Sequence, residues 1–400
     1  MNVPKLRFKE FTDEWKTHKL KDFFSKITKK NKSNSIHNVI SNSAKFGLVK
    51  QIDYFSKDIA NTDNTEGYFI IEKNDFVYNP RKSLEAPFGP ICKYNYNETG
   101  IVSPLYLCFR CSQLINYDFF EYLFKSSVWY KYIYQNGDSG ARHDRVNIKD
   151  STFFLMPIFV PQSKEQEKIA KFLTTVDKKI TNLENTITSL ENQKKGLLQQ
   201  IFSQKLRFKD KNGNNYPNWK KKKLGDIGSI ITGTTPSTKH LEYYSNEYLW
   251  VTPTDIIGKN ISNTNKKLSK LGLEKGRIIP ANSVLVTCIA SIGKNAILRT
   301  LGSCNQQINA ITPTDNYNVD FVYYLICYEE NLLHLYAGTG GMEILNKEQF
   351  SKISMLFPCL EEQTKIADFL SAFDRKLENQ KAQLEHWKQI KKGLLQQMFV

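Results

Sequence analysis

The chain has 400 residues, a formal net charge of +16 and a pI near 9.3. A length of this order predicts two or three domains, each able to bury a sizeable core. No apolar run is long enough to cross a bilayer, and the first residues lack the apolar core of a signal peptide, so we expect a cytoplasmic protein without a membrane partner. The basic residues are spread along the chain, and their excess favours a polyanionic partner, nucleic acid first.

Metal, redox and nucleotide chemistry are not indicated by the sequence. Six histidines are scattered without metal-ligand spacing, and seven cysteines, an odd number, favour reduced thiols over a disulfide framework. Cys108 and Cys111 form a single CxxC in a strand-like segment, where buried thiols are the simpler interpretation. Residues 292–295 resemble the end of a phosphate loop but lack the earlier glycine and the following serine or threonine. We therefore expect no metal, no catalytic residue and no cofactor in this chain.

Residues 1–160 are interpreted as a short lead-in segment followed by a mixed body of strands and helices. The segments 67–83 and 100–111 each indicate a pair of strands, because two strand-like runs flank a turn. Apolar residues at steps of three and four predict one aromatic helix over 118–135. Residues 153–161 predict a final extended strand before the next element.

Two places in this first body carry side chains suited to DNA. One is the glycine-flanked loop over 137–145, and the other follows the strand that ends near residue 80. Arginine can fork onto guanine O6 and N7 or onto phosphate, and a solvated loop is the alternative interpretation. The candidates are Arg81, Lys82, Arg142, His143 and Arg145.

Residues 161–203 predict a long helix, which begins after Pro161. Its apolar residues follow alternating steps of four and three, which is the heptad seam of a coiled coil. At about 1.5 Å per residue the helix is roughly 60 Å long, and it needs a partner to bury the seam. Only Lys194 interrupts a seam that consists of Ile169, Leu173, Val176, Ile180, Leu183, Ile187, Leu190, Leu197 and Ile201.

The second half of the chain repeats this organisation, with a lead-in segment and body over 204–357 and a second long helix over 358–400. The two helices align without a gap, and 19 of 42 aligned residues are identical, which favours pairing over two unrelated amphipathic helices. If the second helix returns near the N-terminus, the chain has a pseudo-two-fold internal repeat. The lead-in segments share Leu6-Arg7-Phe8 with Leu206-Arg207-Phe208, and Trp15 with Trp219.

The second body has the same predicted order of elements, including strand, loop and strand over 277–298 and a helix over 321–337. Its DNA candidates are hydroxyl, amide and lysine side chains on turns. Amides suit adenine N6 and N7, and hydroxyls donate to phosphate. Plain turns, and amides satisfied by the sheet backbone, are the alternatives. The candidates are Thr234, Thr235, Ser237, Ser291, Lys294, Asn305, Gln306 and Gln307.

The ends of the two helices are more alike than packing alone requires, with EQ-x-KIA-x-FL at the start and KKGLLQQ-x-F at the finish. This sameness predicts that two copies of one partner dock there. Gly196 and Gly393 inside the helices cost stability, which suggests a close backbone approach, with a local break as the alternative. The docking candidates are Glu165, Gln166, Ile169, Phe172, Lys195 and Gln199, and Glu362, Gln363, Ile366, Phe369, Lys392 and Gln396.

Two variable bodies, each followed by P-x-x-x-EQ-x-KIA-x-FL…KKGLLQQ-x-F, resemble the specificity subunit of a type I restriction-modification enzyme. The segments TGTTPS, VTPTDI, ASIGKN and CNQQINAI of the second body, and GIVSPLY of the first, also resemble that family. The resemblance covers essentially the whole chain.

The resemblance implies an α+β chain in which two mixed α/β target recognition domains are separated by two long antiparallel coiled-coil helices. Each domain is expected to read one half of an asymmetric bipartite site in double-stranded DNA, with the helices as the spacer. The subunit itself is expected not to be catalytic and to dock two modification subunits, which bind S-adenosylmethionine and methylate adenine. Restriction subunits, which use ATP and Mg, complete the endonuclease. A stand-alone DNA-binding coiled-coil protein and a coiled-coil adaptor are the alternatives.

Overall fold

The structure is a computed structural model that describes residues 2–54, 65–113, 115–139, 144–337 and 343–400. The chain forms two compact units. Unit 1 comprises residues 1–184 and 382–400, and unit 2 comprises residues 185–381. Both long helices are shared between the units, so the predicted division into bodies and helices runs across them. Within the described ranges, no helix is both long and apolar enough to span a membrane.

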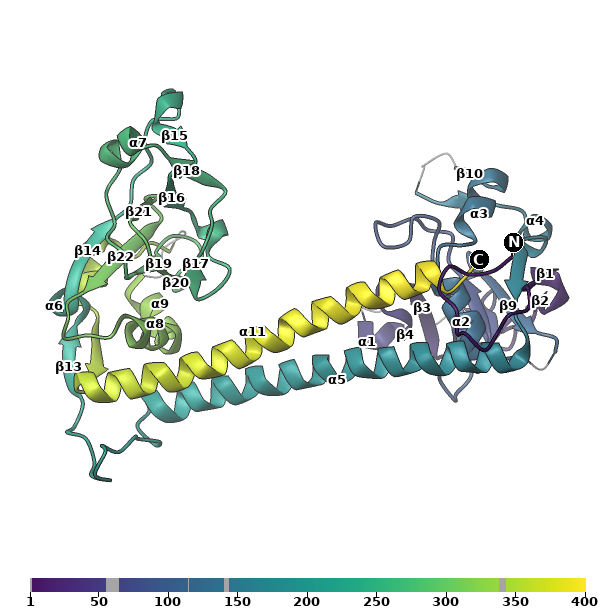
Figure 1. Ribbon diagram of the computed structural model, residues 1–400, viewed down its shortest axis with the longest axis horizontal. Helices are drawn as coiled ribbons and strands as arrows, with labels where there is room; N and C mark the ends of the chain where they lie inside the picture. The colour runs from purple at the N-terminus through teal and green to yellow at the C-terminus, as the bar shows by residue number, and fades with distance from the viewer. Residues whose placement is uncertain (1, 55–64, 114, 140–143, 338–342) are drawn as a thin grey trace. The chain divides into compact units, whose positions relative to one another are not determined.

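The two long helices are α5 (Ser163–Phe202) and α11 (Leu360–Gln397), and they begin just after Pro161 and Pro358 as predicted (Figure 1). In each unit a segment of α5 lies antiparallel to a segment of α11, because rising residue numbers on one helix face falling numbers on the other. The alignment can be followed in four ion pairs: Asp177–Lys391 and Glu184–Lys388 in unit 1, and Glu191–Lys381 and Lys194–Asp374 in unit 2.

The predicted heptad seam is buried over most of α5 but only in part of α11. Ile169, Leu173 and Leu190 are fully buried in α5, and Ile366 and Leu370 are fully buried in α11. The middle of α11 is less covered than the middle of α5, where Leu183 and Ile187 are also buried. Its half-buried seam residues are Phe373, Leu377, Leu384, Trp387 and Leu394.

Unit 1 contains two four-stranded sheets. The order of the first is β2 (Phe24–Lys26), β9 (Leu107–Cys111), β6 (Phe76–Tyr78), β7 (Ile91–Lys93). The order of the second is β4 (Gly47–Lys50), β3 (Val39–Ser43), β8 (Gly100–Val102), β5 (Phe69–Ile71). Two antiparallel ribbons pair β1 (Lys16–Lys19) with β12 (Pro157–Val160), and β10 (Asp138–Ser139) with β11 (Val146–Asn147). The helices are η1 (Leu20–Asp22), α1 (Gln51–Tyr54), α2 (Tyr117–Lys125), α3 (Tyr130–Asn136) and α4 (Asp150–Phe154).

Unit 2 has a five-stranded sheet and a four-stranded sheet. The order of the first is β14 (Gly228–Thr232), β22 (Ile308–Pro313), β19 (Ser283–Thr287), β20 (Asn295–Leu298), β17 (Asn260–Ile261). The order of the second is β15 (Tyr244–Ser245), β18 (Lys266–Leu268), β16 (Tyr248–Val251), β21 (Gly302–Cys304). A ribbon pairs β13 (Lys220–Lys223) with β23 (Ser354–Phe357). The helices are α6 (Leu224–Ile227), η3 (Leu241–Tyr243), η4 (Pro253–Asp255), α7 (Lys270–Lys275), α8 (Val319–Tyr328), α9 (Glu330–Ala337) and α10 (Lys347–Lys352).

Both predicted aromatic or apolar helices of the bodies are helix pairs. The first is α2 and α3, which separate at Ser126, where the hydroxyl donates to Leu123 O at 2.6 Å. The break turns the chain so that Trp129 is buried and donates from Nε1 to Phe124 O at 3.0 Å. The helix predicted over 321–337 is likewise divided into α8 and α9. At the first break, burial of Trp129 therefore overrides a continuous helical period.

Three strand predictions also need correction. The strands predicted over 67–83 exist as β5 and β6, and those predicted over 100–111 as β8 and β9, but the two strands of each segment lie in different sheets and do not pair with each other. The final strand begins at Pro157 rather than at Phe153, because Phe153 and Phe154 end α4 and fill the aromatic core of unit 1.

The lead-in segments contact the ends of the long helices in the same way in both units. In unit 2, the amide of Leu206 donates to Gln200 O at 3.0 Å, just where the chain leaves α5. In unit 1, the amide of Leu6 donates to Gln397 O at 2.9 Å, at the last residue of α11. The second helix thus returns to the N-terminal segment, which is the condition set for a pseudo-two-fold repeat.

Candidate nucleic-acid interface

Three basic residues predicted in unit 1 line one cleft. Arg81, Lys82 and Arg145 surround a hollow of about 400 Å³ at the ends of β3, β6 and β8. An antiparallel bridge places Arg81 directly opposite Arg145, and the amide of Lys82 donates to Asp144 O at 2.8 Å. Like charges in opposite positions are unfavourable unless an anion lies between them. The other two candidates of this loop, Arg142 and His143, lie outside the described residues.

Neutral donors complete the cleft, and the sequence pattern did not single them out. Ser41, Ser43, Ser103 and Tyr106 line it together with the basic residues. Burial raises the pKa of Tyr106, despite the opposing effects of a hydrogen bond with the Asn42 backbone and of the charges on Arg145 and Arg81, so its hydroxyl stays protonated at neutral pH. Hydroxyls next to guanidinium groups are the usual contacts of a phosphate backbone.

The corresponding edge of unit 2 is built from four turns that hydrogen bonds tie together. Thr234 N donates to Cys304 O, Asn305 N donates to Val251 O, both at 2.9 Å, and Cys288 N donates to Gln307 O at 2.8 Å. Lys294 Nζ donates to Pro253 O at 3.0 Å and so links the turn over 288–294 directly to the turn over 252–254. The predicted candidates of unit 2 are therefore neighbours on one edge.

The amide candidates of unit 2 differ in how accessible they are. Asn305 is buried, its side chain donates to Gln307 Oε1 at 2.9 Å, and its Oδ1 accepts from the Gln307 amide at 3.1 Å. Because both hydrogen bonds lie within the turn, the side chain of Asn305 stabilises the turn. Gln306 is exposed and accepts from Thr235 Oγ1 at 2.7 Å, so this pair presents polar atoms to solvent.

The loop between β19 and β20 has a backbone that favours exposure of its tip. Ala290 and Gly293 adopt positive φ angles of 64° and 87°, which are rare for alanine and natural for glycine. The resulting turn leaves Ser291 and Lys294 exposed, as is Ser237 on the neighbouring turn. Thr254, which sequence reasoning missed, is also exposed here and lies 2.9 Å from Thr252 Oγ1 through its own hydroxyl.

The two edges occupy the same position in the two folds. In unit 1, β3 pairs in parallel with β8, with Ile40 opposite Val102. In unit 2, β16 pairs in parallel with β21, with Val251 opposite Cys304. In unit 1 the turn after β8 carries Ser103 and Tyr106 of the cleft, while Arg81 and Lys82 follow β6 and Arg145 precedes β11. In unit 2 the turn after β21 carries Asn305, Gln306 and Gln307. The framework is constant, while the side chains change from arginine and serine to threonine, glutamine and lysine.

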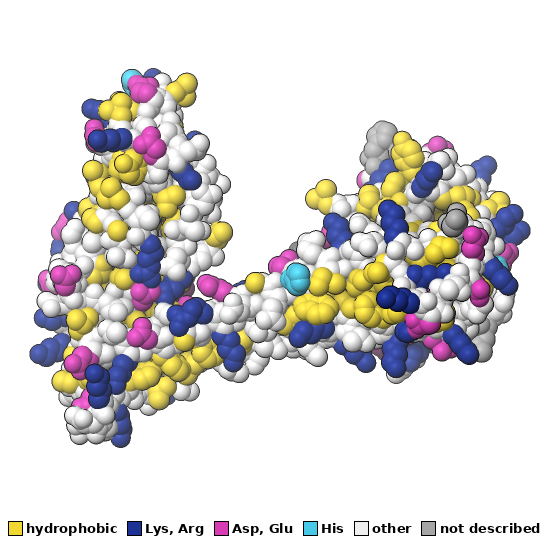
Figure 2. Space-filling model, in the orientation of Figure 1, with side chains coloured by type: hydrophobic (Ala, Val, Ile, Leu, Met, Phe, Trp, Pro, Cys, Tyr) yellow, Lys and Arg dark blue, Asp and Glu magenta, His cyan; other side chains and the backbone are white. Residues whose placement is uncertain are grey.

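Basic side chains also cover other parts of both units, as Figure 2 shows for one face of each. The distribution of basic side chains therefore does not identify one edge as the interface. The candidate interface is defined by the clustered turns. Among the described residues no group of His, Cys, Asp and Glu could hold a metal ion. Burial raises the pKa of the Cys288 thiol to about 12, so this cysteine is a protonated core residue at neutral pH.

Five of the predicted docking residues lie in the interior of the chain and are corrected. Glu165 is 1% exposed, and its carboxylate accepts from Arg7 Nε at 2.7 Å and from Trp15 Nε1 at 3.3 Å. Glu362 is fully buried and makes the same contacts with Arg207 and Trp219. A buried side chain has no surface to offer a partner. The other three interior residues are Ile169, Ile366 and Gln363.

The remaining docking candidates are at or near the surface. Phe172 and Phe369 are 38% and 37% exposed, and each ring packs edge-on against the phenylalanine of a lead-in segment, Phe8 at 5.8 Å and Phe208 at 5.5 Å. Lys195, Gln199, Lys392 and Gln396 are exposed, and Gln166 is half-buried.

The two helix glycines have no close neighbour. A Cβ atom added to Gly196 or Gly393 would meet nothing within 4 Å among the described residues. The predicted close backbone approach is therefore wrong within this chain, and the local break is also absent, because α5 and α11 continue through both positions.

Comparison with known proteins identifies the family. Residues 12–192 and 216–386 match the family model of the type I restriction modification DNA specificity domain. Because these two segments make up most of the chain, the chain belongs to this family and carries its domain twice. The resemblance inferred from the repeat and the helix ends is confirmed.

Two curated relatives and one solved structure illustrate the similarity. The MjaIX specificity subunit of Methanocaldococcus jannaschii is 32% identical over 189 residues, or 46% of this chain and 44% of that protein. The HindI specificity subunit of Haemophilus influenzae is 33% identical over 149 residues, or 36% of this chain and 32% of that protein. The chain thus matches less than half the length of these relatives. A crystal structure of the type I restriction-modification S subunit from M. genitalium shares the fold, with a TM-score of 0.58, 15% identity and coverage of 100% of this chain and 99% of that one.

Proposed function

We propose that this chain is the DNA specificity subunit of a type I restriction-modification enzyme and that each unit reads one half of an asymmetric bipartite site. The observation that carries the proposal is the pair of equivalent edges with different side chains. In unit 1 the edge presents Arg81, Lys82 and Arg145, and in unit 2 it presents Thr235 and Gln306. One framework with two different sets of donors is suited to two different half-sites.

The chemistry of each edge limits what it reads. Two guanidinium groups in unit 1 suit phosphates or the O6 and N7 acceptors of guanine. The exposed amide of Gln306 suits adenine, whose N7 accepts and whose N6 donates, while Lys294 and Ser291 suit phosphate. The long helix pair acts as the spacer between the two half-sites.

The test is an exchange of bodies. Residues 20–160 are replaced by the equivalent body of another specificity subunit, and the chimera is expressed with its modification subunits. Methylation mapping is expected to show one altered half-site, with the other half and the gap unchanged. An alteration of both halves contradicts the assignment of one reader to each unit.

Catalysis is assigned to the partner subunits. We infer that two modification subunits, which bind S-adenosylmethionine, dock on this chain in the cytoplasm, and that restriction subunits using ATP and Mg join them. Support comes from the surface formed by Phe8 and Phe172 in unit 1, which Phe208 and Phe369 repeat in unit 2. Two equal apolar surfaces on one chain fit two copies of the same partner.

The docking surface is tested with Phe172→Asp and Phe369→Asp, alone and together. Each single variant is expected to lose one modification subunit on co-purification, and the double variant both. Tyr134→Asp is the matched control, because Tyr134 is 74% exposed on α3 and its ring lies against Phe88. Retention of two modification subunits by the double variant places the docking surface elsewhere.

A further inference from the structure

We propose that two Lys–Asp ion pairs, Lys194–Asp374 and Asp177–Lys391, fix the register between α5 and α11 and attach each recognition body to the helix pair. This inference rests on the proposed function only in its consequence for the DNA gap. The four residues occupy equivalent positions of the repeat, because Lys194 aligns with Lys391 and Asp177 aligns with Asp374.

The geometry of the two pairs is alike. Each lysine Nζ lies 2.5 Å from the aspartate of the opposite helix. The side chains are shielded, with Lys194 and Asp374 22% and 12% exposed. Both lysines interrupt the heptad seam, so the ion pairs stand where apolar contacts are expected.

Each aspartate also accepts a hydrogen bond from a recognition body. Tyr324 of α8 donates to Asp374 Oδ2 at 2.6 Å, and Tyr122 of α2 donates to Asp177 Oδ2 at 3.0 Å. Burial raises the pKa of both tyrosines, so their hydroxyls are protonated donors. Each aspartate therefore joins three elements: its own helix, the opposite helix and one helix of the body.

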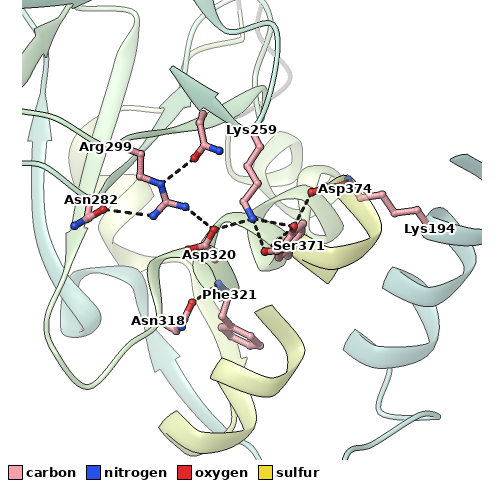
Figure 3. A network of polar contacts seen from close by, with 11 residues as sticks. Lys194, Lys259, Asn282, Arg299, Asn318, Asp320, Phe321, Ser371 and Asp374 are labelled. Carbon is pink, nitrogen blue, oxygen red and sulfur yellow. Dashed lines mark hydrogen bonds and ion pairs between the residues drawn. The ribbon is translucent and has the colours of Figure 1, made fainter. Parts of the chain in front are cut away.

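In unit 2 the polar contacts around Asp374 continue into the recognition body, as Figure 3 shows. We call each such set of contacts around Asp374 or Asp177 a junction. Lys259 Nζ donates to Ser371 Oγ at 2.7 Å and to Tyr324 OH at 2.9 Å, and it pairs with Asp320 at 2.7 Å. Arg299 Nη2 pairs with the same carboxylate at 2.6 Å. In unit 1, Thr174 takes the position of Ser371, 3.3 Å from Tyr122 OH.

A slipped register breaks both junctions. A shift of α11 by one heptad in either direction keeps the apolar seam in contact but places Asp374 opposite Ile201 or Ile187. The same shift places Asp177 opposite Met398 or Leu384. These are seam residues, so both carboxylates lose their ion-pair partners in an apolar setting, which is unfavourable. Apolar contacts alone distinguish these registers weakly, and a polar pair inside a seam is a known means of selecting one.

The test replaces both pairs with apolar residues in the full-length chain, as Lys194→Met, Asp374→Leu, Lys391→Met and Asp177→Leu. The charge-reversed variant, Lys194→Asp with Asp374→Lys and Lys391→Asp with Asp177→Lys, is the matched control. The register is measured with a short bis-maleimide that crosslinks cysteines placed at Glu191 and Lys381. In the unaltered chain, Lys381 Nζ lies 2.6 Å from Glu191 Oε1. Mass spectrometry of the digested protein distinguishes this link from links to the native cysteines.

The apolar variant is expected to fold, because replacing a shielded ion pair by apolar residues is often neutral or stabilising. Its specific crosslink is expected to fall at least twofold, and the reversed variant is expected to recover it. An unchanged crosslink in the apolar variant overturns the inference.

With modification subunits added, the apolar variant is expected to methylate sites with more than one gap length. If the crosslink falls but all methylated sites have a single gap length, the ion pairs fix the register of the helices but do not control the DNA gap. Absence of sequence-specific methylation by the unaltered chain counts against the proposed function and leaves the crosslink result standing.

Discussion

Arg7 and Glu165 form a two-pronged ion pair, with Nε to Oε1 at 2.7 Å and Nη2 to Oε2 at 2.8 Å, between the lead-in segment and the first turn of α5. Arg207 and Glu362 repeat it in unit 2 at 3.1 and 2.7 Å. Planar, bidentate pairs of this kind hold one geometry. The repeated Leu-Arg-Phe and Glu-Gln sequences are therefore explained by one internal clamp used twice.

The clamp predicts a large stability cost when its arginine is removed. Arg7→Met leaves the Glu165 carboxylate buried without its counter-charge, and the loss is expected to be about 3 kcal/mol or more. Arg81→Met changes an exposed arginine of the same unit and is expected to cost less than about 0.5 kcal/mol. Urea unfolding measures both. Equal costs for the two variants contradict a structural role for the clamp.

The ion pairs of Asp320 with Lys259 and Arg299 predict that the folded chain loses stability in acid. Burial raises the pKa of Asp320, but hydrogen bonds and charge from Arg299 and Lys259 outweigh it and hold the pKa below the usual aspartate range. A lowered folded-state pKa gives stability that is present above the unfolded pKa and is lost as pH falls through the folded pKa. Stability of the unaltered chain is therefore expected to fall more steeply below about pH 4 than that of Asp320→Asn. Parallel curves of unfolding midpoint against pH count against this.

The arginine pair of unit 1 predicts a salt-dependent loss of DNA binding. Arg145→Ala is expected to weaken binding and to reduce the slope of log affinity against log salt by about one if it contacts a phosphate. Folding stability is expected to stay the same or rise, because the substitution relieves the repulsion from Arg81. Lys131→Ala, an exposed lysine outside the cleft, is the control. Unchanged binding of the assembled enzyme by Arg145→Ala removes this residue from the interface.

The spacer role predicts a defined change in the DNA gap. One heptad is inserted into α5 between Glu184 and Glu191 and another into α11 between Lys381 and Lys388, which leaves both Lys–Asp pairs in place. Seven residues add about 10 Å of helix, or roughly three base pairs at 3.4 Å each. Methylation mapping is expected to show both half-sites unchanged and the gap longer by about that number. An unchanged gap refutes the spacer role, and insertion into α5 alone is the mismatched control.

Repeats and periodicity predicted the architecture well, because both are local properties of the sequence. The apolar steps from Ile169 to Ile201 are visible without any knowledge of the partner helix. The role of Glu165 was missed because its meaning depends on Arg7, which is distant in sequence and adjacent in space. Lys194 was seen only as an interruption for the same reason, since Asp374 lies on the other helix.

The candidate site was predictable as a set of turns and less so as individual contacts. Asn305 and Gln306 are neighbours of similar chemistry, yet one is buried in its own turn and the other is exposed. Only the direction in which the turn points each side chain decides between them. Thr254 and the serines of the unit 1 cleft carry no sequence signal that separates them from ordinary turn residues.

The contact of Leu6 with Gln397 has the same form as that of Leu206 with Gln200, although only the second is enforced by a short connection in the chain. Peptide continuity at this junction is therefore dispensable for the contact itself. A circular permutant that starts at Lys205 and joins Val400 to Met1 by a short linker is expected to fold and to keep both half-sites. The order in which the two bodies are synthesised is then a matter of genetic history rather than of architecture.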